Sequence, residues 1–227
     1  MAKYVISDIH GRMDKFHEML KKIDFKTDDE LFIIGDVIDR GPDGIPLLQE
    51  IMNSPNMHLI MGNHEYMFTR YYMKGSTEED REVWNINHNE DTKAAFRDLS
   101  HREKMDIFDY VASLPTHMVV DTKERSYYLV HGCPGECRHD RVWSRPGTDF
   151  KNPQPEYRLI VGHTPVWFFG DEGEKPAQYI LDMMTTGGQC SIYKNPEFID
   201  LDCGCGHDFS CSALSCMRLG DEKEFYV

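Results

Sequence analysis

Short apolar runs alternate with amphipathic stretches through the first 65 residues of the chain. Three apolar runs have the length of buried strands, and they cover residues 4–6, 31–34 and 58–61. Between them, apolar side chains recur at helical spacing over residues 13–23 and again over residues 45–52, where Pro42 suits the start of the second helix. The order strand, helix, strand, helix, strand predicts an α/β fold with parallel strands.

The middle of the chain has a different pattern from its two ends. Residues 65–114 are helical in pattern, and Ser76 and Thr77 are followed by acidic residues, as at a helix start. This stretch is either a helical insertion, around residues 66–114, that covers one side of a site, or more of the same α/β scaffold.

After Pro115 the chain is rich in short β-type runs separated by Gly, Pro and Asn. These runs predict a second sheet built from the later part of the chain. They cover residues 117–120, 127–130, 158–161, 190–193, 198–201, 214–219 and 224–227. Residues 146–155, with three prolines and a glycine, are expected to form a surface loop.

The composition fits a single globular domain spanning residues 1–227. A chain of 227 residues can bury a full core without disulfides, and 40% hydrophobic and 28% charged residues exclude wholesale disorder. No apolar run approaches the ~20 residues of a membrane helix. We expect a cytoplasmic protein, because the start shows no secretory signal and the cysteine count, seven, is odd.

The charge of the chain narrows its partners. Lys and Arg number 25 and Asp and Glu number 39, so the formal net charge is 25 − 39 = −14. Such a surface repels phosphate backbones and argues against extended nucleic acid as a partner. A small phosphorylated substrate remains compatible with it, because bound cations can invert the local field. The oligomeric state stays open.

Polar side chains able to bind metals follow five of the predicted strands. They are Asp8 and His10, Asp36, Asn63 and His64, His131, and His163. Each cluster alone has an ordinary interpretation as a turn. Five such clusters, each directly after an apolar run, indicate a site at the carboxyl edge of a sheet. Mixed oxygen and imidazole ligands suit Mn, Fe, Zn or Co better than calcium.

Three of these segments carry a family resemblance. Residues 7–11 (SDIHG), 35–41 (GDVIDRG) and 62–65 (GNHE) resemble the GDxHG, GDxxDRG and GNHE blocks of the phosphoprotein phosphatase family of binuclear metallophosphoesterases, in its bacterial serine/threonine type. His131-Gly132 and Gly162-His163-Thr164 resemble its two later histidine blocks. The chain departs from the family pattern at Ser7, where Gly is usual, and at Cys133, where small residues are more usual.

The resemblance implies a fold and a metal centre. The fold would be a two-sheet β-sandwich flanked by helices in α-β-β-α layers. One divalent transition-metal ion would be held by Asp8, His10 and Asp36. A second would be held by Asp36, Asn63, His131 and His163, with the Asp36 carboxylate bridging the two. Mn is the ion expected to work in vitro, with Fe or Zn as alternatives.

The resemblance also implies the chemistry. A water or hydroxide between two cations is a strong nucleophile near neutral pH and would attack phosphorus directly. His64 would give a proton to the leaving oxygen, and Asp39 would orient its imidazole. Arg40 would bind the phosphate, together with Arg145 or, as the alternative, Arg141.

Three functions compete at this point. The first is hydrolysis of phosphomonoesters, above all Ser/Thr phosphoproteins. The second is hydrolysis of dinucleoside polyphosphates such as diadenosine tetraphosphate, which would need a pocket for adenine. The third is a catalytically silent metal-binding scaffold, which would require a lost ligand or a lost acid, and neither is lost here.

Other histidines and cysteines receive a structural interpretation. The histidines outside the five clusters are expected to be surface or core residues; they are His17, His58, His88, His101, His117, His139 and His207. The four cysteines of the tail (Cys203, Cys205, Cys211 and Cys216) are expected to be reduced and packed, because their spacing matches no familiar zinc site.

Overall fold

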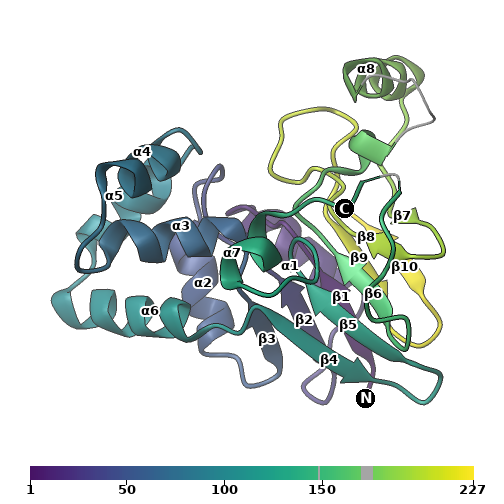
Figure 1. Ribbon diagram of the computed structural model, residues 1–227, viewed down its shortest axis with the longest axis horizontal. Helices are drawn as coiled ribbons and strands as arrows, with labels where there is room; N and C mark the ends of the chain where they lie inside the picture. Colours follow the sequence, from purple (N-terminus) through teal and green to yellow (C-terminus); the bar gives the residue numbers. More distant parts are fainter. Residues whose placement is uncertain (148, 170–175) are drawn as a thin grey trace.

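The computed structural model describes residues 1–147, 149–169 and 176–227, and its strands form two five-stranded sheets (Figure 1). The first sheet has the order β10-β9-β1-β2-β3. Its strands are β1 (Lys3–Ile6), β2 (Glu30–Ile34), β3 (Met57–Ile60), β9 (Ser215–Arg218) and β10 (Lys223–Tyr226). The second sheet has the order β4-β5-β6-β8-β7. Its strands are β4 (His117–Asp121), β5 (Ser126–Val130), β6 (Arg158–Val161), β7 (Tyr193–Lys194) and β8 (Phe198–Asp200).

The alternation of side chains along each strand builds two cores. Val5 of β1 and Phe32 of β2 point toward the second sheet and share a core with Leu129 of β5. Their neighbours Tyr4 and Leu31 point the opposite way and pack in a core with the helices. Because both faces of the parallel strands are covered, these strands read as continuous apolar runs in the sequence.

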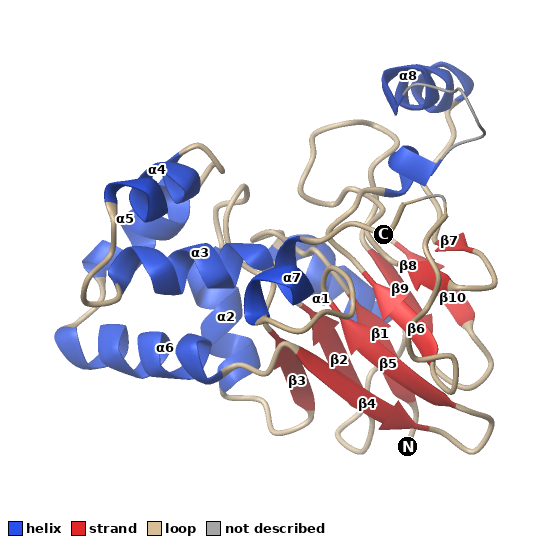
Figure 2. Ribbon diagram, in the orientation of Figure 1, coloured by secondary structure: helices blue, strands red, loops and turns tan. Residues whose placement is uncertain are grey.

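The helices do not all lie together: most of them pack in the core on the outer face of the first sheet and gather on one side of the molecule, whereas the last one, at residues 176–186, lies apart on the side of the strands (Figure 2). The helices are α1 (Met13–Lys22), α2 (Gly44–Met52), α3 (Asn63–Tyr72), α4 (Glu78–Asn85), α5 (Glu90–Asp98), α6 (His101–Ser113), α7 (Arg138–Trp143) and α8 (Pro176–Thr186), with the 3-10 helix η1 (Val166–Phe169). The α/β class and the two sheets flanked by helices are confirmed. None of the described helices is both long and apolar enough to cross a membrane.

The stretch expected to be helical contains four helices, α3 to α6, and their starts follow from local chemistry. The Thr77 side chain caps α4 by accepting from the Asp80 backbone N–H, and Asp80 Oδ2 in turn accepts from the Thr77 backbone N–H at 2.9 Å. Ser100 and Glu103 form the same reciprocal pair at the start of α6. Each pair satisfies backbone N–H groups that have no partner inside the helix.

Two expectations about the later strands need correction. The strands at the end of the chain do not all join the second sheet, because β9 pairs antiparallel with β1 and β10 pairs with β9. The pairing sets Tyr4 against Arg218 and so covers the edge of β1 that β2 leaves free. The run at residues 190–193 is strand only at Tyr193–Lys194. Local pattern identifies a strand but does not specify its partner.

Candidate metal centre and its surroundings

The predicted ligands lie on loops that leave the strand ends of both sheets. Asp8 and His10 follow β1, Asp36 follows β2, and Asn63 begins α3 just after β3. From the second sheet, His131 follows β5 and His163 follows β6. The site therefore forms only where the two sheets meet.

These loops hold an unusual backbone. Among the described residues, nine non-glycine residues have positive φ, and six belong to the predicted site: Asp8, His10, Asp36, Asp39, Arg40 and His163. Positive φ is costly for residues with a Cβ and concentrates at functional sites. The strained backbone positions of these loops therefore coincide with the predicted site.

Asp36 lies between two groups of side chains able to hold a metal ion. One group is Asp36 with His10 and His64, the other is Asp36 with His131 and His163, and the ligand atoms within each group lie within 4.8 Å of one another. All five side chains are buried. Converging carboxylate and imidazole donors of this kind fit a pair of divalent transition-metal ions. Among the described residues these are the groups found, and no cysteine belongs to either.

The other two predicted ligands adjoin the same groups. Asp8 Oδ1 lies 3.9 Å from His10 Nε2. Asn63 Oδ1 lies 3.0 Å from His131 Nε2, which is itself 3.3 Å from Asp36 Oδ2. The structure thus brings all six predicted ligands together in one buried cluster.

Burial and mutual charge shift the pKa values of these groups. Burial raises the pKa of Asp8 well above its usual range, and nearby Asp202 adds to the rise. Burial acts the same way on Asp36, but the surrounding imidazoles of His131, His64 and His10 outweigh it and hold the Asp36 pKa well below its usual range. Burial also lowers the pKa of His163 to about 2, so this imidazole is neutral and can donate a lone pair.

Backbone carbonyls orient two of the imidazoles. The Ile38 carbonyl lies 3.1 Å from His10 Nδ1, and the Ile34 carbonyl lies 2.8 Å from His131 Nδ1. Both rings therefore turn Nε2 toward the centre, as in metal sites whose ligands are fixed by a second hydrogen bond.

Glu65 ties the loops of β2 and β3 together. Its Oε2 accepts hydrogen bonds from the backbone N–H of Asp36 (2.8 Å) and Gly62 (3.0 Å), and its Oε1 accepts one from Val37 at 2.8 Å. The sequence showed Glu65 only as the last residue of a motif. Its position in that motif was the available signal for this role.

His64 and Asp39 form a buried pair beside the ligand cluster. His64 Nδ1 lies 2.7 Å from Asp39 Oδ2, and both side chains are fully buried. His64 Nε2 has no hydrogen-bond partner and lies 3.9 Å from Asp36 Oδ2, so it faces the centre. This is the arrangement expected of a positioned proton donor.

The ligands open into a cavity of about 450 Å³ that Arg40 and Arg145 also line. Arg145 Nη1 donates to the His163 carbonyl at 3.1 Å, and Arg40 Nη1 donates to His207 Nε2 at 3.3 Å. Arg141, the alternative to Arg145, instead donates to the Gly135 carbonyl and to Thr116. Of the two candidates, Arg145 lines the cavity, and Arg141 is not among its lining residues.

His207 was expected to be a surface or core residue, yet it lines the cavity and holds Arg40. Burial, reinforced by the Arg40 guanidinium, lowers the pKa of His207 to about 4, so the neutral ring can accept the Arg40 hydrogen bond. Nothing in the local sequence signals this contact, which joins residues 167 positions apart. The four tail cysteines are free and buried, as expected.

Comparison with known proteins places this geometry in a family context. Residues 1–199 match the family model described as calcineurin-like phosphoesterase. A symmetrical bis(5'-nucleosyl)-tetraphosphatase of Wigglesworthia glossinidia brevipalpis is 39% identical over 85 residues, which cover 36% of this chain and 31% of the relative. The enzyme of the same name from Cellvibrio japonicus is 36% identical over 74 residues, covering 32% and 27%. The matches span about a third or less of these relatives.

Solved structures share the fold. A putative diadenosine tetraphosphatase superposes with a TM-score of 0.61 at 15% identity, covering 100% of this chain and 92% of that one. A serine/threonine phosphatase from Saccharomyces cerevisiae superposes with a TM-score of 0.62 at 12% identity, covering 96% and 72%. At such identities the likeness concerns the fold alone.

Proposed function

This chain belongs to the calcineurin-like phosphoesterase family, and we propose that within it the protein hydrolyses dinucleoside polyphosphates. It is a metal-dependent phosphoesterase. Within that activity, the relatives that match about a third of the chain are named for tetraphosphate substrates and support the dinucleotide alternative better than the phosphoprotein interpretation.

One observation carries the proposal of a phosphorylated substrate. Arg40 and Arg145 line the same cavity as Asp36, Asn63 and His163. Two guanidiniums in one cavity with the metal ligands suit a phosphorylated substrate. They would serve a phosphomonoester as well, so the names of the relatives are what favours a dinucleoside polyphosphate.

The proposed roles follow from the contacts of the side chains. Asp8, His10 and Asp36 would hold one divalent cation, and Asp36, Asn63, His131 and His163 would hold the other. When bound, such a pair polarises phosphoryl oxygens and lowers the pKa of water. The guanidiniums of Arg40 and Arg145 would bind non-bridging oxygens and set the attacked phosphorus in place.

His64 would complete the reaction. As the oxygen of water bonds to phosphorus, the bond from phosphorus to the leaving phosphate oxygen breaks, and His64 Nε2 would give its proton to that oxygen. Asp39 would hold the ring through Nδ1 and so keep Nε2 directed at the leaving oxygen. We also propose that residues 1–227 form one metallophosphoesterase domain, which the core shared by both sheets supports.

A substrate panel tests the proposal. The purified protein, stripped of metal and then supplied with Mn²⁺, would be assayed with diadenosine tetraphosphate, p-nitrophenyl phosphate and a phosphoserine peptide. We expect the highest kcat/KM on diadenosine tetraphosphate, with ADP as the product if cleavage is symmetrical. A higher kcat/KM on the phosphopeptide would overturn the proposal in favour of a protein phosphatase.

A further inference from the structure

Trp167, Phe168 and Phe209 are three of the aromatic residues that line the cavity, and we call them the aromatic wall. Trp167 and Phe168 belong to η1, whereas Phe209 lies on the loop between β8 and β9. The rings of Trp167 and Phe209 meet edge to face, with centroids 5.9 Å apart. Two separate segments thus contribute to one apolar surface.

Part of this wall is uncovered. Phe168 is 55% exposed and Phe209 is 37% exposed, whereas Trp167 beneath them is only 4% exposed. Large aromatic rings that remain exposed beside a polar cavity are typical of ligand sites, where the apolar part of a ligand covers them.

The aromatic wall lies beside the two arginines of the cavity. The Arg145 guanidinium carbon is 5.9 Å from the centroid of the Phe168 ring. On the other side, His207, which accepts from Arg40, stacks on Phe209 with centroids 5.8 Å apart and planes inclined by 6°. Arg145 therefore adjoins Phe168 directly, and Arg40 is linked to Phe209 through His207.

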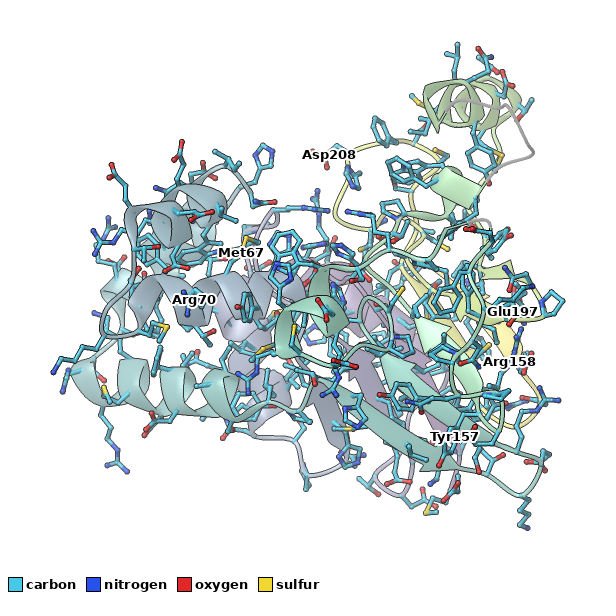
Figure 3. The ribbon with its side chains drawn as sticks, in the orientation of Figure 1. Met67, Arg70, Tyr157, Arg158, Glu197 and Asp208 are labelled. Atoms are coloured by element: carbon cyan, nitrogen blue, oxygen red, sulfur yellow. The ribbon has the colours of Figure 1, made fainter. Side chains whose placement is uncertain are left out.

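The loop that carries Phe209 is anchored. Asp208, which Figure 3 labels at the outer end of this loop, forms an ion pair with Arg12 at 2.5 Å. Gly206 packs so closely on His10 that a Cβ would overlap the imidazole. Anchoring limits the freedom that Phe209 must lose on binding a ligand.

We infer that the aromatic wall is a subsite for a nucleobase joined to the bound phosphate. The inference rests on the proposed function and adds the residues that would recognise the substrate. Stacking suits any base, because every base has a flat π-face. A phenolic ring has similar chemistry, so the test separates a nucleobase from phosphotyrosine.

Binding of AMP and of inorganic phosphate to the Mn²⁺-loaded protein tests the subsite by calorimetry. We expect AMP to bind more tightly than phosphate. Phe168→Ala and Phe209→Ala should each weaken AMP roughly tenfold and leave phosphate unchanged. Met105→Ala, which removes an exposed apolar side chain on α6, serves as the matched control and should change neither.

Two outcomes would overturn the subsite. One is AMP binding no tighter than phosphate, or binding that the two Phe variants leave intact. The other is O-phosphotyrosine binding more tightly than AMP with the same dependence on Phe168 and Phe209, which would assign the wall to a phenolic ring. Because calorimetry requires no turnover, failure of the subsite is distinguishable from failure to hydrolyse diadenosine tetraphosphate.

A second and independent observation concerns Trp84. Its indole Nε1 donates to Asp39 Oδ2 at 2.7 Å, the same oxygen that lies 2.7 Å from His64 Nδ1. Trp84, Asp39 and His64 are all fully buried. A buried carboxylate oxygen held by two N–H groups has little freedom to move.

The helices α4 and α5 fix both partners. The Trp84 ring, on α4, packs edge to face against Phe68 and Tyr71, with centroids 5.7 and 4.9 Å away. Thr92 of α5 accepts a hydrogen bond from the Asp39 backbone N–H at 3.0 Å. The helical stretch thus contacts both the side chain of Asp39, through Trp84, and the backbone N–H of Asp39, through Thr92.

We propose that Trp84 is a positioning residue for the proton donor, acting through Asp39. Trp84→Phe keeps an aromatic ring but removes the N–H. We expect kcat to fall roughly tenfold on phenyl phosphate, a substrate with a poor leaving group, and distinctly less on p-nitrophenyl phosphate. KM, bound metal and the melting temperature should change little. Tyr71→Phe, in the same ring cluster, should have no such effect.

The comparison of leaving groups separates positioning from packing. A merely structural role would lower activity on both substrates alike, together with the melting temperature, and that result would overturn the proposal. An unchanged kcat on phenyl phosphate in a folded Trp84→Phe protein would overturn it as well.

Discussion

Asp36 illustrates how one side chain can serve several neighbours. Its Oδ1 accepts the His64 backbone N–H at 3.0 Å, while its Oδ2 lies 3.3 Å from His131 Nε2 and 3.7 Å from His10 Nε2. Gly62 has no side chain where a Cβ would meet the Asp36 carboxylate. The negative charge of Asp36 is thus shared between both groups of ligands.

Loss of that charge should be more damaging than loss of a neutral ligand. We predict that Asp36→Asn binds fewer metal ions than Asn63→Ala, because Asp36 belongs to both groups whereas Asn63 adjoins one. Metal counts by inductively coupled plasma spectrometry on both proteins would check the order. An Asp36→Asn protein that retains two tightly bound ions would contradict it.

A single residue, His207, makes the stability of the folded protein depend on pH. An unfolded histidine takes up a proton below about pH 6.5, whereas folded His207 does so only near its pKa of about 4. Between these values the unfolded state binds more protons, so stability falls as the pH is lowered from about 6.5 to about 4.

We predict that His207→Gln removes part of this loss. The quantity to compare is the free energy of unfolding of His207→Gln minus that of the wild type. This difference should be higher at pH 5 than at pH 7.5 by on the order of 1 kcal/mol. We expect a small free-energy difference because the His207 ring is only half-buried. Urea unfolding at both pH values measures the difference, and an equal difference at both would contradict the prediction.

At the scale of elements, the loop between β8 and β9 packs closely against the ligand cluster. Gly206 lies on this loop, where a Cβ would overlap the His10 ring and lie 3.0 Å from Arg40 Cδ. The close approach is available only to a residue without a side chain.

We therefore predict that Gly206→Ala lowers kcat/KM by roughly tenfold and weakens Mn²⁺ binding, because either the loop or His10 must move. Gly147→Ala is the control, since the nearest atom to a Cβ there is the flexible end of Asp149 at 3.1 Å. Calorimetric titration with Mn²⁺ measures the metal affinity of both variants. Wild-type affinity in Gly206→Ala would show that the loop yields without disturbing the site.

The sequence could predict site residues that stand close together along the chain, but not contacts between residues far apart along it. Asp8 and His10, or Asn63 and His64, stand together in short segments after strands, and local pattern was enough to single them out. Trp84 approaches Asp39 from 45 positions away. No local signal reports such a contact, because it depends on how α4 packs against α3.

The same limit applies to the sheets. The apolar run of β9 is visible in the sequence, but its pairing with β1, some 210 positions earlier, is not. That partner is selected by the free edge of β1 and by burial against the second sheet, where Met217 joins Val5 in the shared core. Both depend on the assembled fold.

For the molecule as a whole, the metal centre joins the two sheets. Asp8, His10, Asp36 and Asn63 come from loops of the first sheet, whereas His131 and His163 come from the second. Cations held by both sets would bind the folded state and not the unfolded chain, and so would stabilise the sandwich.

We predict that removing metal lowers the melting temperature and that Mn²⁺ restores it. At a free ion concentration ~1,000 times Kd, the gain is about 4 kcal/mol, or roughly 8–16 °C for a domain of this size. His131→Asn should reduce the Mn²⁺-dependent rise, and His101→Asn, an exposed residue at the start of α6, should not. A melting temperature that does not change when a chelator is added would contradict the prediction.

The pairing of β9 with β1 also matters while the chain is being made. The edge of β1 has no β9 partner until residue 215 has been synthesised, which takes roughly 10–40 s after β1 at ~5–20 residues per second. During that time an apolar strand edge is open to pairing with other chains. Nascent chains arrested before residue 215 should therefore co-sediment with chaperones or aggregates, and chains released at full length should not.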